Sequence, residues 1–230
     1  MKKVKQISTV FMALLAILNC TIICMATSLG LSWEELTPDE ETAFLNNAKI
    51  HFLESEPSRL AIECFDVNKD GIIIIGSSNM DNRYICVYDA DGNFLYGYTF
   101  ESNGSFRVEW DDSDNITVYY VRSDIVHTIN TNGETLQVRR MLDTGKNRDY
   151  WRNEVNATSK TVLGTEYKLQ KGMGILGFFS SSYSKLVAVN NDGEERIIYD
   201  VSSVHSLKVF FYSNNYSCFY CYCGFKFTKI

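Results

Sequence analysis

The chain has 230 residues, which is enough for one domain with appended segments. Its net charge of −6 argues against nucleic-acid binding, because that function requires a basic face. A composition that is 45% apolar and 13% aromatic, with only 2 prolines, argues against a disordered chain and favours β-strands.

The N-terminal segment has the pattern of a membrane-targeting sequence. The run MKKVKQ carries three lysines and no acid, and an uncharged apolar run follows it up to Ala26. Its length is typical of a long signal peptide or of a helix that spans the bilayer. We therefore expect residues 1–28 to be a signal peptide or an N-terminal membrane anchor, with the membrane as a partner. Because such lysines stay in the cytoplasm, the rest of the chain is expected outside the cell, at the cell membrane or secreted.

An acidic segment, residues 29–47, follows the apolar run. Thr37 is a good N-cap, Pro38 suits the first helical position, and acids fill the first turn. These signals predict a short helix over residues 38–47, between the membrane and the folded domain. The run KIHFLES after it predicts the first strand.

The stretch CFDVNKDGIIIIGSS, residues 64–78, resembles a calcium loop in its first half. Asp66, Asn68, Asp70 and Gly71 match the first, third, fifth and sixth positions of an EF-hand loop. The twelfth position is Ser77, which cannot supply two carboxylate oxygens, and the flanks are strand-like rather than helical. We therefore favour a tight turn between two strands, with a weak cation site as the alternative.

The same turn chemistry recurs along the chain. Residues 87–98, 128–139 and 188–199 each place an Asp/Asn-rich turn ending in Gly between two apolar or alternating runs, the glycines being Gly92, Gly133 and Gly193. WDDSDNITVYYV from Trp110 resembles FDVNKDGIIIIG from Phe65, with Asn115 in place of the glycine. These patterns predict β-hairpins and a degenerate internal repeat.

Strands are expected at short intervals through the β-domain, residues 48–203. The predicted strands are 60–66, 72–77, 83–89, 93–100, 106–111, 115–122, 125–130, 135–141, 162–169, 173–179, 184–190 and 195–201. Residues 143–160 are polar and predict a loop or a short helix. The fold class is therefore all-β, with antiparallel hairpin repeats forming propeller-like sheets in an incomplete or small ring; the alternative is a β-sandwich. Strands that are apolar on both faces, such as 84–88, should be covered on both sides.

The strand and turn segments over about residues 60–203 resemble a known group of proteins. IECFDVNKDGIIIIG, YICVYDADGNFLYGYTF and MGILGFFSSSYSKLVAVNNDGEERIIYDVSS look like parts of uncharacterised, membrane-anchored, β-rich surface proteins of low-GC Gram-positive gut bacteria. The resemblance implies a surface-exposed protein and carries no activity. Members of the group tend to end in a C-terminal hydrophobic span, and this chain departs from that pattern. Its tail, residues 204–230, is aromatic and Cys-rich. We expect this tail to be either a disordered segment or the product of a frameshift near residue 205.

The seven cysteines do not form one framework. Cys64 and Cys86 lie in predicted strands. We favour the interpretation that both are small buried hydrophobic residues. The alternative is a disulfide between them, as an exported protein could form. Cys218, Cys221 and Cys223 resemble half a zinc site without its other ligands. We expect no metal site and no cofactor.

No catalytic motif is recognisable, and we therefore assign no catalytic or cofactor-binding residue. Asp111, Asp112 and Asp114 fit a solvated turn better than a glycosidase pair. The candidate ligand-contact residues are Tyr150 and Trp151, which the run RDYWRNEVN could present to a sugar or a peptide. The alternative is a loop that its own aromatic side chains anchor.

These observations favour an exported or membrane-anchored β-repeat domain that acts as a surface binding or sensing module for a protein or glycan ligand. The sequence favours a protein that is not an enzyme over one that is. The alternatives are an extracellular hydrolase whose residues are spread through loops, and a structural or degenerate ectodomain.

Overall fold

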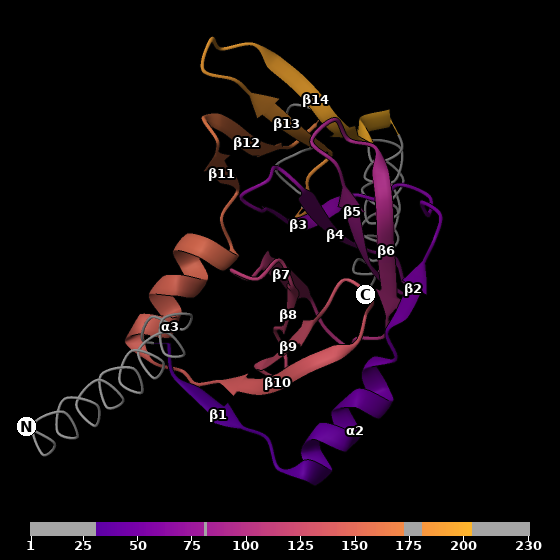
Figure 1. Cartoon of the computed structure of the whole chain (residues 1–230), viewed down its shortest axis with the longest axis vertical. Coiled ribbons are helices and arrows are strands. Elements are labelled where there is room, and N and C mark those ends of the chain that lie inside the picture. Colours follow the sequence, from indigo (N-terminus) through magenta and orange to yellow (C-terminus); the bar gives the residue numbers. More distant parts are fainter. Residues whose placement is uncertain (1–30, 81, 173–180, 204–230) are drawn as a thin grey trace, which may run out of the picture.

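The computed structural model describes residues 31–80, 82–172 and 181–203. These residues form an all-β protein built from three antiparallel sheets, with short helical segments at its periphery (Figure 1). Three predicted segments lie outside the described residues, namely the apolar segment 1–28, the strand 173–179 and the tail 204–230.

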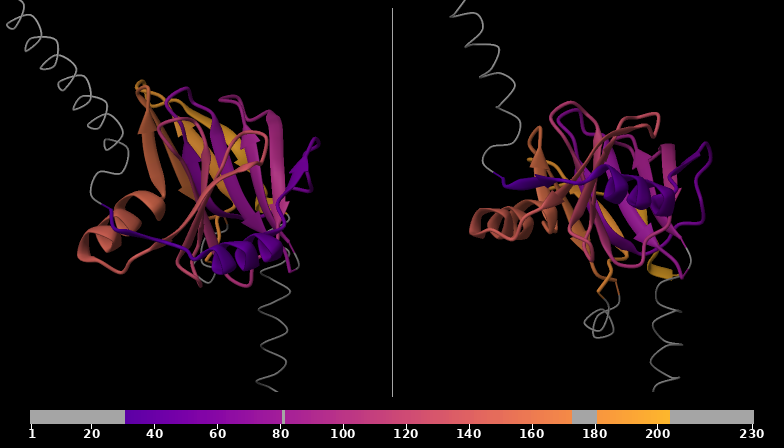
Figure 2. Two further views of the ribbon diagram at one scale, coloured as in Figure 1. Left: turned by 60° about the horizontal axis from the view of Figure 1, so that its bottom comes forward. Right: turned by 90° about the horizontal axis from the view of Figure 1, so that it is seen from below.

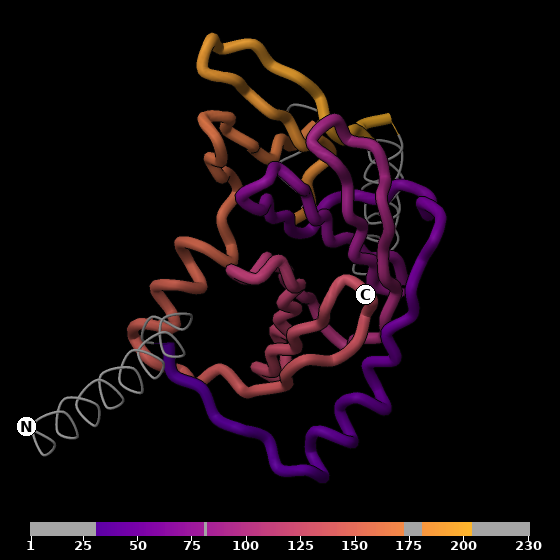
Figure 3. Tube along the Cα trace, viewed as in Figure 1, coloured from indigo at the N-terminus to yellow at the C-terminus, as the bar shows by residue number. Residues whose placement is uncertain are grey.

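Each sheet is built around four strands that follow one another in the chain. The middle sheet contains β3 (Ile62–Val67), β4 (Ile73–Ser78), β5 (Arg83–Tyr88) and β6 (Phe94–Phe100), with β2 (His51–Leu53) added beside β6. The second sheet contains β7 (Phe106–Trp110), β8 (Ile116–Tyr120), β9 (Ile125–Ile129) and β10 (Thr135–Met141), with β1 (Trp33–Glu35) added beside β10. The third sheet contains β11 (Ser159–Val162), β12 (Thr165–Gln170), β13 (Lys185–Val189) and β14 (Glu195–Asp200). The described strands close no barrel, and the tube trace in Figure 3 follows the chain through the sheets in turn.

The middle sheet is buried on both faces. Ile74 faces the second sheet, in a core with Val118, whereas Ile73 faces the third sheet, in a core with Leu186. Figure 2 shows the sheets stacked in layers. Burying an isoleucine side chain contributes about 1.5–3 kcal/mol, so the run of isoleucines after Gly71 stabilises two cores at once. The expectation that residues 84–88 are covered on both sides is confirmed, because Ile85 and Cys86 lie in different cores.

Five hairpins share one turn geometry. In each, the side-chain oxygen of an Asp or Asn accepts hydrogen bonds from the backbone N–H groups two and four residues later. These residues are Asn68, Asp89, Asp111, Asn130 and Asn190. The residue three positions later has positive φ in every case, and it is Gly71, Gly92, Asp114, Gly133 or Gly193. In the Trp110 segment the glycine's place is thus taken by Asp114 (φ 59°) and not by Asn115.

The stretch at residues 66–71 is a turn rather than a calcium loop. The Asn68 amide oxygen is occupied by the backbone of its own turn. Asp66 is buried in β3, where its carboxylate pairs with Lys160 at 2.6 Å and accepts the backbone N–H of Trp110 at 2.7 Å. The Asp66 carboxylate therefore connects β3 to β7 and β11 inside the fold.

The first strand of the third sheet differs from the prediction. Residues 162–169 were expected to be one strand, but Leu163 (φ 51°) and Gly164 (φ 78°) make a tight turn between β11 and β12. A leucine at positive φ is uncommon, and the sequence therefore gave little sign of this turn.

The helices agree with the polar segments predicted for them. Helix α2 (Pro38–Ala48) has Thr37 as its N-cap, and the Thr37 backbone N–H donates to the Glu40 carboxylate at 3.0 Å to complete a capping box. Phe44 and Ala48 pack against the core between the middle and second sheets. Helix α3 (Gly145–Tyr150) continues into the π-helix η1 (Trp151–Val155). Within the described part of the chain, no helix is long and apolar enough to span a membrane.

Candidate functional site

The outer face of the second sheet is covered by a helix instead of another sheet. Helices α3 and η1 lie against this face, and β1 adds the strand that borders it (Figure 1). Tyr119, Val126 and Val155 form a small buried cluster there, and the partly buried rings of Tyr150 and Trp151 pack against it. Both candidate ligand-contact residues therefore belong to this helical cover.

Tyr150 fixes the helix to the sheet. Its hydroxyl donates to the carboxylate of Glu109 on β7, and the Tyr119 hydroxyl donates to the other oxygen of that carboxylate at 2.6 Å. Burial raises the pKa of Glu109, and the two hydroxyl donors partly oppose that shift. Tyr150 also lines a recess of about 540 Å³ that Trp33 and Arg139 border.

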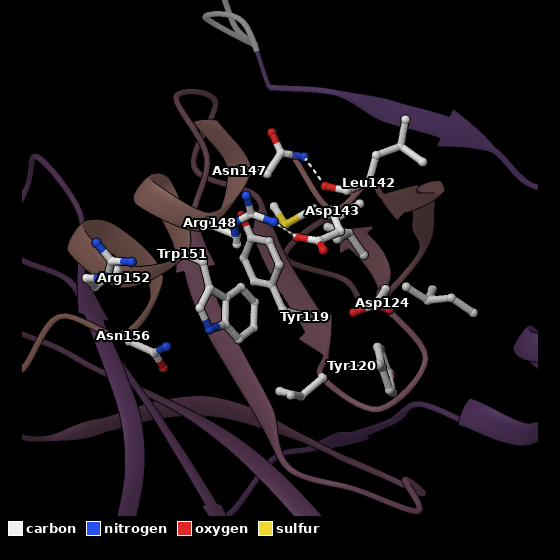
Figure 4. A pocket seen from close by; sticks show the side chains of 14 residues that line it. Tyr119, Tyr120, Asp124, Leu142, Asp143, Asn147, Arg148, Trp151, Arg152 and Asn156 are labelled. Atoms are coloured by element: carbon white, nitrogen blue, oxygen red, sulfur yellow. Dashed lines mark hydrogen bonds and ion pairs between the residues drawn. The ribbon is translucent and has the colours of Figure 1, made fainter. Parts of the chain in front are cut away.

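Trp151 lines a different recess, which Tyr150 does not line. Its ring meets the Tyr119 ring edge to face at 5.6 Å between centroids. We call the space beside it the Trp151 cavity; it measures about 660 Å³, and Figure 4 shows the side chains that line it. They are Tyr119, Tyr120, Val121, Asp124, Ile125, Val126, Met141, Leu142, Asp143, Asn147, Arg148, Trp151, Arg152 and Asn156.

The Trp151 cavity combines an apolar floor with charged groups at its rim. Arg148 pairs with Asp143 at 2.8 Å, and Arg152 pairs with Asp149 at 3.5 Å. All four side chains are more than half exposed, so these pairs contribute little to stability. Asp124 lies at the β8–β9 turn, and its carboxylate has no ion pair or side-chain hydrogen bond among the described residues. Cavities of this size and mixed lining commonly bind small ligands.

Asn147 ties the cavity to the start of the described chain. Its side chain is buried; its amide oxygen accepts the Ser32 backbone N–H at 3.0 Å, and its amide nitrogen donates to the Ser32 carbonyl at 2.7 Å. The same nitrogen donates to the Leu142 carbonyl at 2.8 Å. The wall of the cavity and the segment that precedes β1 are thus one hydrogen-bonded unit.

The sequence predicted Tyr150 and Trp151 as one aromatic pair, but they line two recesses. It did not indicate Glu109, Asn147 or the exposed arginines of the helix, because these residues come together only when α3 docks on the sheet. A polar segment with aromatic residues between predicted strands was the one available signal.

The remaining candidate groups are buried in the cores. Cys64 and Cys86 are free thiols whose pKa burial raises to about 12. They lie in cores on opposite faces of the middle sheet, so the alternative of a disulfide between them is wrong. His127 is buried against Phe44, with centroids 5.5 Å apart, and burial lowers its pKa to about 4. Among the described residues, no three His, Cys, Asp or Glu side chains are grouped closely enough to hold a metal ion.

No known family model matches the chain, and no curated protein is significantly similar to it. The site must therefore be interpreted from its own geometry.

Proposed function

We propose that the protein is a surface binding module whose ligand site is the Trp151 cavity. In this proposal residues 1–28 attach the chain to the membrane as a signal peptide or anchor, and the β-domain lies outside the cell. The observation that carries the proposal is the cavity itself, which has an apolar and aromatic floor and rim charges in weak, exposed pairs. Such rim groups can exchange their partners for a ligand at low cost.

The repeated four-strand unit supports a binding role. Each unit consists of four antiparallel strands in chain order. We propose that the three units are repeats like propeller blades and form a rigid scaffold. Rigid scaffolds of this kind position loops and short helices for binding. The resemblance to β-rich surface proteins of Gram-positive gut bacteria supports the same proposal.

A hydrolase that uses the neighbouring recess is the second candidate. Glu109 lines that recess, and a buried carboxyl group with a raised pKa is a common general acid. However, the two oxygens of Glu109 already accept hydrogen bonds from Tyr119 and Tyr150, and the Asp111 side chain is used by its turn. These contacts favour a structural role for the acids, so binding is the better proposal.

A ligand screen on the full-length protein, purified in detergent, tests the binding proposal. A chemically mixed library of sugars, peptides and metabolites should contain compounds that raise the unfolding temperature of the wild type but not of the Trp151→Ala variant. Tyr84→Phe, a surface substitution outside the cavity, is the matched control and should respond like the wild type. A library without any Trp151-dependent compound would contradict the proposal.

Protease treatment of intact cells tests the topology. We expect protease added from outside to digest the β-domain and deletion of residues 1–28 to release the protein from membranes. Deletion of residues 206–230 should leave membrane association unchanged. Release of the protein by the C-terminal deletion instead would show that the tail is the anchor.

A further inference from the structure

We propose that the Trp151 cavity binds a short peptide with a free C-terminal carboxylate and an apolar side chain. This inference rests on the proposed binding function and adds the chemical class of the ligand. Three features of the cavity carry it, namely the guanidinium groups of two arginines four residues apart, an unpaired carboxylate from the β8–β9 turn, and the apolar side chains in its lining.

The guanidinium groups come from one helical surface. Arg148 lies in α3 and Arg152 in η1, four residues apart, and both line the cavity. Their present partners, Asp143 and Asp149, are 81% and 68% exposed, so water already competes for these pairs. Guanidinium binds a carboxylate or a phosphate through two parallel hydrogen bonds, and a carboxylate is the one of these groups that ends a peptide.

The opposite charge is offered by Asp124. Figure 4 shows Asp124 and Arg152 on opposite sides of Trp151. The Asp124 carboxylate has no ion pair among the described residues, which leaves it available to an ammonium group. A peptide carries both charges at its two ends, and a cavity of about 660 Å³ lies within the range used for ligands of that size.

The floor favours a peptide over a sugar. Met141, Ile125 and Leu142 supply aliphatic surface that suits an apolar side chain. Tyr119 is only 4% exposed, so its ring offers little surface on which a sugar could stack. A neutral sugar would also give the two arginines no charged partner.

Binding measurements on the full-length protein in detergent test this inference. The probes are the tripeptide alanyl-leucyl-phenylalanine, its C-terminal amide, its N-acetyl form, and a trisaccharide of glucuronic acid. We expect the free peptide to bind, the amide to bind at least about tenfold more weakly, and the N-acetyl form to lose less. The Arg148→Gln and Arg152→Gln variants should each weaken binding of the free peptide by about tenfold.

Arg196→Gln is the matched control, since Arg196 is an exposed arginine of β14 that pairs with Asp91 away from the cavity. It should leave the affinity unchanged, and the unfolding temperature of each variant checks its folding. Equal affinity for the peptide and its amide, or binding of the acidic trisaccharide alone, would overturn the inference. If the mixed library contains Trp151-dependent compounds but none of the peptide probes binds, the inference fails while the binding function stands. A library without such compounds contradicts both the peptide inference and the binding function.

Discussion

The middle and second sheets share one plan of four successive strands but differ in what covers them. The middle sheet packs against a sheet on each face, and its strands alternate between two apolar cores. The second sheet has a sheet on one face only, and on the other it has α3 and η1, with β1 as its edge strand (Figure 1). In this fold buried side chains fill the interfaces between the sheets, whereas recesses lie beside the helical segment, at Trp151 and at Tyr150. The two cores of the middle sheet thus supply most of the buried apolar surface, and the helical cover of the second sheet holds the proposed ligand site.

The largest expected effect comes from filling space in the middle sheet. A Cβ atom added at Gly76 would lie 2.4 Å from the Cys64 sulfur and 2.9 Å from the Phe106 ring. We expect Gly76→Val to lower the free energy of unfolding by about 3 kcal/mol or more, measured by chemical denaturation. Gly145→Ala in α3, where nothing lies within 4 Å, is the control and should change stability by less than about 0.5 kcal/mol. Similar losses for the two variants would break the comparison.

The next largest effect is the pH dependence of stability in the core between the middle and second sheets. Burial lowers the pKa of His127 from 6.5 to about 4, so this residue adds stability above pH 6.5 that is lost as the pH falls toward 4. The loss should reach about 3 kcal/mol at most. Comparing denaturation curves of the wild type and His127→Phe between pH 7 and pH 4 isolates the contribution of His127. His51→Gln, at an exposed histidine, should follow the wild type, and an unchanged pH dependence in His127→Phe would refute the prediction.

A smaller effect is expected at the helical cover. Tyr150→Phe removes a donor to the partly buried carboxylate of Glu109, and we expect a loss of about 1–2 kcal/mol. Limited proteolysis should show faster cleavage around residues 143–158, because this cover docks through few contacts. Tyr84→Phe, whose hydroxyl only accepts a long bond from Asn79, is the control. Cleavage confined to the middle sheet would contradict the prediction.

The smallest effect concerns a turn at the edge of the third sheet. Gly193 has φ of 80° and no atom within 4 Å of an added Cβ, so Gly193→Val costs only backbone strain. We expect a loss of about 1 kcal/mol in thermal or chemical unfolding. Gly193→Asn should lose less, because Asn tolerates this backbone region. Equal losses in the two variants would argue against a backbone origin.

The sequence predicted the strands well where one physical signal dominated. In the first two sheets the strand boundaries agree with the prediction to within about two residues, because apolar runs and Asx–Gly turns alternate there. Helix 38–47 was recognised from its cap and is one residue longer. Strand β1 was missed because Trp33–Glu35 is too short to show a period and depends on pairing with β10.

The site could be predicted only in part, because it too depends on contacts between distant segments of the chain. Tyr150 and Trp151 were recognised as aromatic residues in a polar segment. That they point into different recesses depends on how α3 lies on the sheet, which no local pattern encodes. The separation of Cys64 from Cys86 likewise depends on which face of the middle sheet each one occupies.

The hydrogen bonds between Asn147 and Ser32 have a mechanical consequence. Tension applied at residue 31 is carried first by these bonds and by the three paired residues of β1, since both hold the chain to α3 and β10. This short connection should yield before the stacked sheets do, and it would deform the wall of the Trp151 cavity as it gives way. Single-molecule pulling from that end should show a small early extension ahead of the main rupture, and its force should fall in Asn147→Ala. A protein held at a surface by this end would thus have its first point of yielding beside the proposed ligand site.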